Sequence, residues 1–289
     1  MSAPLLLPLD QQVIVITGAS SGIGLCTARL AAARGARVVL VARSGDVIYQ
    51  ASAEIDAAGG RSIAVPADVA SREQLEAAAL AAVEVFGRID TWVNNAGVSI
   101  HGRLDAVSED DSRRLFATNF WGVVNGSLVA MPHLERRGGA LINVGSAASE
   151  SALPLQGMYA CSKLAVQSFT DTLRVEVQEI DRSPVSVTLI QPSAVGTPHA
   201  EHAAKYHGID TPRAGALLDP IDVAEAILAA ATESTHAVKV GTPPTTAESL
   251  AHWLPSLAER VAADRAARAT AGALHHPSKS GRTHSHASS

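Results

Sequence analysis

The sequence predicts one α/β domain built on a doubly wound, parallel, seven-stranded sheet with helices on both faces, which is a three-layer architecture. From residue 13 onward, short β-branched runs alternate with longer Ala-rich stretches, as is typical of βαβ units. Most of the short runs are apolar throughout, as strands covered on both faces are. The chain has 289 residues, of which 47% are hydrophobic and 18% charged, so it can bury one large core.

The expected strands, in chain order, are 13–17, 37–42, 62–66, 91–94, 140–144, 185–190 and 237–240. Helical stretches lie between them, beginning with 25–33 after the first strand. Ser71 and Gln74 have the spacing of a capping box, and Asp219 with Pro220 provides a cap and first turn before a helix over 223–231. Residues 111–120 and 159–180 are expected to form two further helices.

These elements define the domain organisation. Residues 1–245 are expected to form the sheet domain, including a long connection at 193–219 that is typical of a substrate-binding loop. Residues 246–270 have apolar side chains at helical spacing and predict a C-terminal helical extension. Residues 271–289 are rich in Ser and His without an apolar period, so a disordered tail is expected.

Composition narrows the functional classes. The chain has 23 Lys and Arg against 28 Asp and Glu, and the net charge of −5 argues against nucleic-acid binding, which needs a basic surface. No apolar run reaches the roughly 18 residues expected of a membrane span. The two cysteines, Cys26 and Cys161, are too few for a disulfide framework. Together with a first segment that lacks the basic region of a signal peptide, they predict a cytoplasmic location.

A glycine-rich turn directly follows the first strand. Gly18, Gly22 and Gly24 permit a tight turn and a close approach of the backbone to a ligand, and the helix that follows presents free N–H groups to a pyrophosphate. Because the turn connects a strand to a helix in a doubly wound sheet, dinucleotide binding is the favoured interpretation. The alternative is a tight turn that binds no ligand.

The second strand indicates which dinucleotide binds. In NAD-binding proteins an acidic residue follows the glycine turn by about 20 positions and contacts the ribose 2′-OH. Here that region contains Ala42 and Arg43 and no carboxylate. A guanidinium suits a 2′-phosphate, so NADP(H) is expected to be preferred over NAD(H). The alternative for Arg43 is a solvated charge at a strand end.

Five motifs in order resemble the short-chain dehydrogenase/reductase family: Thr17-Gly18-x-x-x-Gly22-x-Gly24, Asn94-Asn95-Ala96-Gly97, Asn119, Ser146 and Tyr159-x-x-x-Lys163. The similarity covers roughly residues 11–241. It implies a single-domain Rossmann fold, a nicotinamide cofactor, hydride transfer between an alcohol and a carbonyl, and a homodimer or homotetramer.

The resemblance also implies a cofactor site. Asp68 is expected beside the adenine, and the stretch from Pro192 to Thr197 at the nicotinamide end, with Ser193 where the family commonly has glycine. The predicted cofactor-binding residues are Gly18, Ser20, Ser21, Gly22, Ile23, Gly24, Arg43, Asp68, Val69, Asn95, Ala96, Gly97, Tyr159, Lys163, Pro192, Val195 and Thr197.

The predicted catalytic residues are Asn119, Ser146, Tyr159 and Lys163. Tyr159 and Lys163 are four apart on one predicted helix, so their side chains share a face, and the Lys163 ammonium is expected to lower the pKa of the Tyr159 phenol. Ser146 follows a strand and is placed to donate a hydrogen bond to the substrate oxygen. For Asn119 the resemblance implies a water-mediated relay between Lys163 and solvent.

Each catalytic candidate has a simpler alternative. Tyr159 is then a core residue, Lys163 a solvated helix residue, Ser146 a strand-end cap and Asn119 a helix-surface amide. No metal site is expected. His199, His202 and His207 are close in sequence, but they lie in a polar segment without matching cysteines, and the tail histidines are more typical of biased composition.

The leading hypothesis is an NADP(H)-dependent oxidoreductase acting on a carbonyl or secondary alcohol, with Tyr159 as the general acid or base. An apolar stretch at 153–155 favours a moderately apolar small-molecule carbonyl substrate. By the resemblance, helices 111–120 and 162–180 form the subunit interface. The alternative is a catalytically silent NADP-binding regulator with the same fold.

Overall fold

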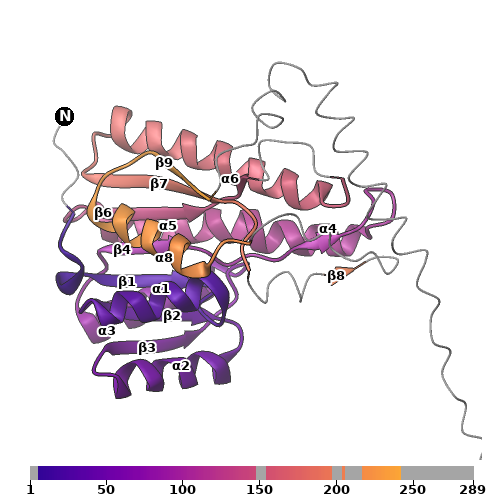
Figure 1. Cartoon of the computed structure of the whole chain (residues 1–289). Helices are drawn as coiled ribbons and strands as arrows, with labels where there is room; N and C mark the ends of the chain where they lie inside the picture. The colour runs from indigo at the N-terminus through magenta and orange to yellow at the C-terminus, as the bar shows by residue number, and fades with distance from the viewer. Residues whose placement is uncertain (1–5, 148–153, 197–203, 206–216, 242–289) are drawn as a thin grey trace, which may run out of the picture.

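The computed structural model describes residues 6–147, 154–196, 204–205 and 217–241 (Figure 1). The C-terminal extension at 246–270, the tail at 271–289, Thr197, most of the connection at 193–219, and His199, His202 and His207 lie outside the described residues. The boundary at 245 lies there too, so the domain division stays a prediction.

A parallel seven-stranded sheet forms the centre of the molecule. Its strands are β1 (Val13–Thr17), β2 (Arg37–Ala42), β3 (Arg61–Pro66), β4 (Thr91–Asn94), β6 (Gly139–Val144), β7 (Val185–Pro192) and β9 (Ala237–Val240). They lie in the order β3-β2-β1-β4-β6-β7-β9, and every neighbouring pair is parallel. The predicted doubly wound fold is confirmed. The order reverses between β1 and β4, and this switch point is where open α/β sheets bind ligands.

Helices cover both faces of the sheet, as Figure 1 shows. One face carries α1 (Gly22–Ala33), α2 (Gly45–Ala57) and α8 (Pro220–Thr232), and the other carries α3 (Arg72–Phe86), α5 (Gly122–Leu134) and α6 (Gly157–Val175). The central strands β1, β4, β6 and β7 are buried along their whole length, which explains their unbroken apolar or small-polar sequence. Successive residues alternate between the two cores: Ile14 and Ile16 face one, Val13 and Val15 the other.

Two helix starts were predicted from capping residues. Asp219 accepts a hydrogen bond from the backbone N–H of Ile221, and Pro220 occupies the first turn of α8, so this cap is confirmed. Ser71 accepts from the backbone N–H of Gln74 at 3.3 Å, but the Gln74 side chain accepts from the N–H of Asp68 instead of returning to Ser71. The capping box is therefore only half formed, and Gln74 ties α3 to the segment after β3.

Both long predicted helices differ from expectation. The helix predicted at 111–120 is α4 (Glu109–Phe116) followed by a π-helical segment, η2 (Ala117–Trp121), which continues into α5. The helix predicted at 159–180 begins two residues earlier, as α6, and ends in a second π-helical segment, η4 (Glu176–Ile180). Local hydrophobic spacing does not distinguish a π-bulge from an α-helix, because both turns bury nearly the same face.

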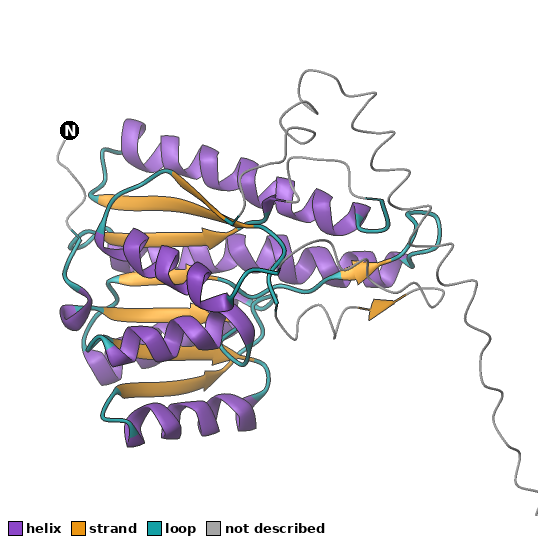
Figure 2. Ribbon diagram, in the orientation of Figure 1, coloured by secondary structure: helices purple, strands orange, loops and turns teal. Residues whose placement is uncertain are grey.

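A small second sheet was not predicted. β5 (Ile100–His101) pairs in parallel with β8 (Ala204–Lys205), and Figure 2 shows both beyond the carboxyl edge of the main sheet. β5 comes shortly after β4, whereas β8 belongs to the long connection after β7. The two ends of the same connection meet in a parallel bridge between Val195 and Leu218. Paired strands this distant in sequence leave no local pattern from which the pairing could be predicted.

Candidate active site

The glycine turn joins β1 to α1 at the switch point. Gly18 and Gly22 have φ of +67° and +54°, a region that side chains rarely adopt. A Cβ on Gly24 would lie 2.3 Å from the carbonyl oxygen of Gly18, so this position also excludes a side chain. Ser21, at the N-cap of α1, makes no side-chain capping bond, which leaves the N–H groups of the first turn for another acceptor. These features fit a bound pyrophosphate.

The turn is fastened to the end of β4 by Thr17. Its hydroxyl donates to the carbonyl of Val93 and accepts from the backbone N–H groups of Asn95 and Ala96, at 3.0 and 3.1 Å. The Asn95 side chain in turn donates to the carbonyl oxygen of Thr17 at 2.9 Å. A Cβ on Gly18 would lie 2.7 Å from the Cα of Ala96. The two predicted cofactor-binding motifs therefore form one rigid surface.

Gly97 lies between the cofactor motifs and the catalytic candidates. A Cβ at this position would be 3.4 Å from Oδ1 of Asn119 and 3.7 Å from Nζ of Lys163. These two residues, 44 positions apart in sequence, are thus brought to the same side of the switch point. Only the tertiary fold brings Asn119 and Lys163 together, because no local sequence pattern relates residues this far apart.

Asn119 is fully buried on the π-helical segment η2. Its Oδ1 accepts from the N–H of Val98 at 2.7 Å, and its Nδ2 donates to the Val98 carbonyl at 2.9 Å and to the Ser162 hydroxyl at 3.1 Å. The alternative that Asn119 is a helix-surface amide is wrong. Its side chain holds the segment after Gly97 against α6, and the water relay implied by the resemblance stays a prediction.

Ser146 and Tyr159 meet at the carboxyl edge of the sheet. Ser146 lies two residues beyond β6 and is buried, and its hydroxyl is hydrogen-bonded to the phenol of Tyr159. Burial raises the pKa of Tyr159 above its ordinary value because the phenolate loses hydration, and the Ser146 hydrogen bond partly opposes this. At neutral pH the phenol is therefore protonated and can act as a proton donor.

Lys163 lies one turn further along α6. Its side chain is only 5% exposed, and Nζ donates to the carbonyl oxygen of Val144, at the end of β6, at 2.9 Å. The alternative of a solvated lysine is wrong. Burial lowers the pKa of Lys163 to about 8, because the ammonium has lost most of its water.

The expected effect of Lys163 on Tyr159 is not found. Nζ lies 6.0 Å from the centroid of the Tyr159 ring, and the pKa of the phenol is raised by burial and not lowered. The shared helix face was predicted correctly, but the net direction of the pKa shift depends on burial. Burial is a tertiary property that the four-residue spacing does not report.

The remaining predicted cofactor residues lie along the same edge. Ser20 and Ile23 belong to the glycine turn and the start of α1, and Pro192 and Val195 lie at and after the end of β7. Asp68 follows β3, and its carboxylate accepts from the N–H of Ala70 at 3.0 Å.

Val69 and Arg43 complete the edge. Val69 packs so tightly on α5 that a Cβ on Gly122 would meet it at 2.6 Å. Arg43 follows β2, is exposed, and makes no hydrogen bond or ion pair that links it to another described residue.

A buried network of hydrogen bonds joins the two strands behind the site to the helix that carries Tyr159. Nδ2 of Asn94 donates to Oδ1 of Asn143 at 2.9 Å, and Nδ2 of Asn143 donates to the Thr170 hydroxyl at 3.0 Å. Nε1 of Trp92 donates to Oδ1 of Asn94 at 2.8 Å. These bonds connect β4, β6 and α6, so they fix the helix that carries Tyr159 against the sheet.

Sequence reasoning missed several of these supporting residues. Thr17 was recognised only as part of the motif, although its place between β1 and the glycine turn is a usable signal. Ser162 joins Asn119 to the carbonyl of Tyr159, to which it donates at 2.7 Å, and no pattern marked it.

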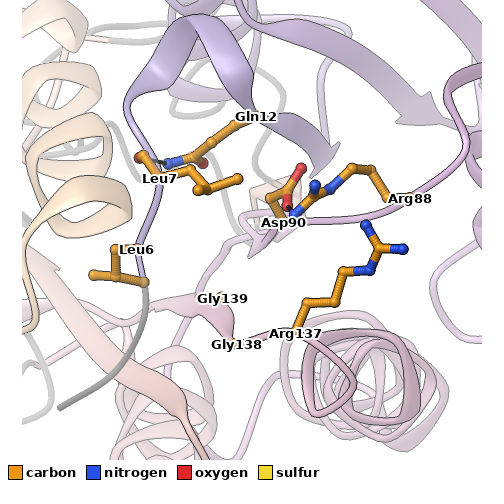
Figure 3. Close-up of a pocket in the computed structure, with 8 residues that line it drawn as sticks. All are labelled: Leu6, Leu7, Gln12, Arg88, Asp90, Arg137, Gly138 and Gly139. Carbon is orange, nitrogen blue, oxygen red and sulfur yellow. Dashed lines mark hydrogen bonds and ion pairs between the residues drawn. The ribbon is translucent and has the colours of Figure 1, made fainter.

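A cavity of about 370 Å³ lies at the opposite, amino-terminal edge of the sheet. Figure 3 shows Arg88 against Asp90 in its wall, with the Arg137 side chain pointing toward them. Asp90 also accepts from the N–H of Val13 at 2.8 Å, so it holds the start of β1. This cavity is remote from Tyr159 and contains none of the predicted site residues.

Metal ligands and membrane spans are absent from the part of the chain that the structure describes. There, no three His, Cys, Asp or Glu side chains come together as a metal site would require. No helix within that part is long and apolar enough to cross a membrane.

Fold and site together define a class, that of doubly wound α/β oxidoreductases. A family model described as short chain dehydrogenase matches residues 12–207. The uncharacterized oxidoreductase YxnA of Bacillus subtilis is 42% identical over 256 residues, which cover 88% of this chain and 72% of that protein. Dehydrogenase/reductase SDR family member 7B of Bos taurus is 34% identical over 88% of this chain and 81% of its own length.

Solved structures agree with this assignment. A short-chain dehydrogenase/reductase from Burkholderia phymatum in complex with NAD has a TM-score of 0.78 at 29% identity, covering 87% of this chain and 96% of that one. An alcohol dehydrogenase from Thermococcus sibiricus complexed with 5-hydroxy-NADP has a TM-score of 0.71 at 27% identity, covering 81% and 99%. The chain belongs to the short-chain dehydrogenase/reductase family, as the motifs predicted.

Proposed function

We propose that the protein is an NADP(H)-dependent oxidoreductase that transfers hydride between the nicotinamide and a carbonyl or secondary alcohol. The observation that carries this proposal is the phenol of Tyr159, hydrogen-bonded to Ser146 and one helical turn from the buried Lys163. A proton donor paired with a second hydroxyl suits a carbonyl oxygen that gains negative charge during reduction.

The chain's own groups then have separate tasks. Ser146 donates a hydrogen bond to the substrate oxygen, and Tyr159 transfers its proton to that oxygen in the reductive direction. When bound, the nicotinamide supplies the hydride for reduction or accepts it in oxidation. Lys163 contributes a cation beside the phenol, and its pKa of about 8 keeps most of it charged at neutral pH. The raised pKa of Tyr159 keeps the phenol protonated at neutral pH, which is the form that the reductive direction uses.

Arg43 supports the preference for NADP(H). It lies at the carboxyl end of β2, beside the glycine turn, and its guanidinium is exposed and makes no hydrogen bond or ion pair with another residue that the structure describes. A planar guanidinium binds a phosphate dianion through two parallel hydrogen bonds. The similar structures contain NAD in one case and 5-hydroxy-NADP in the other, so the fold alone does not decide between the cofactors.

The test is NADPH oxidation by the purified protein with a panel of ketones, aldehydes, quinones and keto-acyl esters, with NADH in parallel. We expect turnover with moderately apolar carbonyls. Tyr159→Phe should lower turnover at least 100-fold while NADPH still binds, since loss of a general acid typically costs 10² to 10⁴ in rate. Tyr49→Phe, an exposed tyrosine on α2, is the matched control.

The cofactor preference has its own pair of variants. Arg43→Gln should weaken NADPH binding about 10-fold or more and leave NADH binding unchanged, because one charge-assisted contact is lost. Arg37→Gln, at the opposite end of the same strand, should change neither. If Arg43→Gln weakened the binding of NADPH and NADH equally, the assignment of the 2′-phosphate to Arg43 would be contradicted.

A catalytically silent NADP-binding regulator remains the second candidate. It would retain the glycine turn and Arg43 but would not use a proton donor. NADPH binding without turnover across the panel, and with no effect of Tyr159→Phe, would favour it.

We also infer a homodimer or homotetramer. Trp121, Leu128 and Leu164 are 55%, 40% and 52% exposed, and they lie on η2, α5 and α6. Trp121 and Leu128 are seven residues apart in one continuous helical run, so they share a stripe. Large apolar side chains exposed in a row are typical of a subunit interface.

A further inference from the structure

The start of α6 lacks the local features that stabilise a helix terminus. Gln156, at the N-cap, makes no side-chain capping bond, and Leu155 before it has φ of +69°. The left-handed conformation costs a residue with a side chain about 1 kcal/mol. Tyr159 is the third residue of the helix, so fraying of this first turn would displace the phenol.

Tertiary contacts from the segment after β4 hold this turn in place. His101 is 3% exposed, and its Nε2 shares a hydrogen bond with the side-chain amide of Gln156. The N–H of Gly102 donates to the carbonyl oxygen of Leu155 at 2.8 Å. Leu104 packs so closely on Gly157 that a Cβ there would lie 2.6 Å from it. Each of the three contacts meets the turn at or before its first residue.

The two halves of the Tyr–Lys pair therefore have different anchors. Lys163 is bonded to the carbonyl of Val144, and Ser162 beside it is bonded to Asn119. The carbonyl of Tyr159 also accepts from Ser162, but Tyr159 lies in the turn that begins at Gln156, and the contacts at the start of that turn come from the segment after β4. A disturbance at His101 should move the phenol and leave the lysine in place.

We propose that His101 is a positioning residue, which acts through Gln156 to hold the first turn of α6 and thereby sets the place of the Tyr159 phenol beside Ser146. The hydrogen bond suits this task because an amide can turn either its N–H or its oxygen toward the ring, and so can pair with the imidazole in either protonation state. His101 is also paired with Lys205 of the connection after β7, so one residue joins that connection to the catalytic turn.

The variants are chosen to separate the hydrogen bond from the bulk of the side chain. His101→Leu and Gln156→Met each remove the bond, and the double variant removes both partners. His101→Gln keeps a polar atom near the position of Nε2. His133→Leu on α5 and Gln178→Met in η4 repeat the substitutions far from the site. If His101→Leu does not fold, Gln156→Met tests the same bond from the other side.

Hydrogen exchange provides a measurement that does not depend on turnover. The N–H of Ala160 donates to the carbonyl of Gln156 at 2.9 Å and reports on the first turn. In His101→Leu and Gln156→Met, amides of that turn should exchange about 10-fold faster, while those from Val166 onward keep their wild-type rate. Unchanged exchange in the first turn, or faster exchange along the whole of α6, would overturn the proposal.

Turnover provides the second measurement and rests on the proposed function. Each single variant should lower kcat about 10-fold with the Kd for NADPH within about twofold, because a misplaced proton donor slows the chemistry and not cofactor binding. The double variant should be no worse than the poorer single one, and His101→Gln should recover most of kcat. Unchanged kcat, or a loss confined to KM, would overturn the positioning role. If the wild type turns over no carbonyl, the proposed function fails and exchange alone decides this inference.

Discussion

Replacing Lys163 with Met should make the protein more stable at neutral pH while abolishing its activity. The side chain is 5% exposed, and burial lowers its pKa from 10.5 to about 8. At 1.36 kcal/mol per pKa unit, this interval corresponds to about 3 kcal/mol of unfavourable free energy for the buried ammonium at pH 7. Met fills a similar volume without a charge.

The gain is reduced by the hydrogen bond that the substitution removes. Nζ donates to the Val144 carbonyl at 2.9 Å, and leaving that carbonyl unpaired costs about 1 to 2 kcal/mol. The expected net change is therefore an increase of about 1 to 2 kcal/mol in the free energy of unfolding. The catalytic contribution of the ammonium is lost at the same time, which is the usual trade between stability and function.

The pH dependence tests this reasoning more sharply than a single value. Between about pH 8 and pH 10 the folded state has released the Lys163 proton while the unfolded state still binds it, so wild-type stability should rise with pH. Lys163→Met should lack this rise, so its advantage at pH 7 should disappear and the wild type should become the more stable of the two by about pH 10. Above about pH 10 the raised pKa of Tyr159 contributes the opposite slope, because the unfolded state then loses its tyrosine proton first.

The assay is urea unfolding of the cofactor-free protein at pH 7, 8, 9 and 10, followed by tryptophan fluorescence. Lys239→Met, an exposed lysine on β9, is the matched control and should keep the wild-type slope. Parallel pH profiles for wild type and Lys163→Met, or a variant clearly less stable than wild type at pH 7, would refute the argument from burial.

Three further substitutions have expected outcomes. Gly24→Ala places a Cβ 2.3 Å from a carbonyl oxygen of its own turn, so it should lower stability by about 1 to 3 kcal/mol and weaken NADPH binding, measured by urea unfolding and by cofactor fluorescence. Asn119→Ala leaves the N–H and carbonyl of Val98 unpaired and should lower the unfolding free energy by about 2 to 3 kcal/mol; a loss below 0.5 kcal/mol would show that these two hydrogen bonds do not stabilise the fold. Trp121→Glu should shift the oligomer toward monomer in sedimentation velocity, whereas Leu80→Glu on α3 should not.

Much of the fold followed from the sequence because the responsible interactions are local. The seven strands lie within two residues of their predicted ends, since each is a short apolar run that must be buried on at least one face. The Asp219 cap depends on a side chain two residues from its N–H partner, and the glycine turn on backbone angles that few other residues adopt.

The chemistry of the site followed only in part. The residue types and the four-residue spacing of Tyr159 and Lys163 were enough to place both on one helix face. The direction of the Tyr159 pKa shift could not be predicted from the sequence, because it depends on how much water the folded chain removes from the phenol.

The sequence by itself determined the family and the seven strands of the main sheet, and it nominated the side chains of the proposed reaction, because these depend on residue type and short spacing. Only the tertiary structure decided what holds those side chains. Thr17 meets Asn95, Asn119 meets Val98, and His101 meets Gln156 across 78, 21 and 55 positions of the chain. Hydrogen bonds over such separations form between surfaces that only the packed sheet and helices bring together, so no local sequence pattern predicts them.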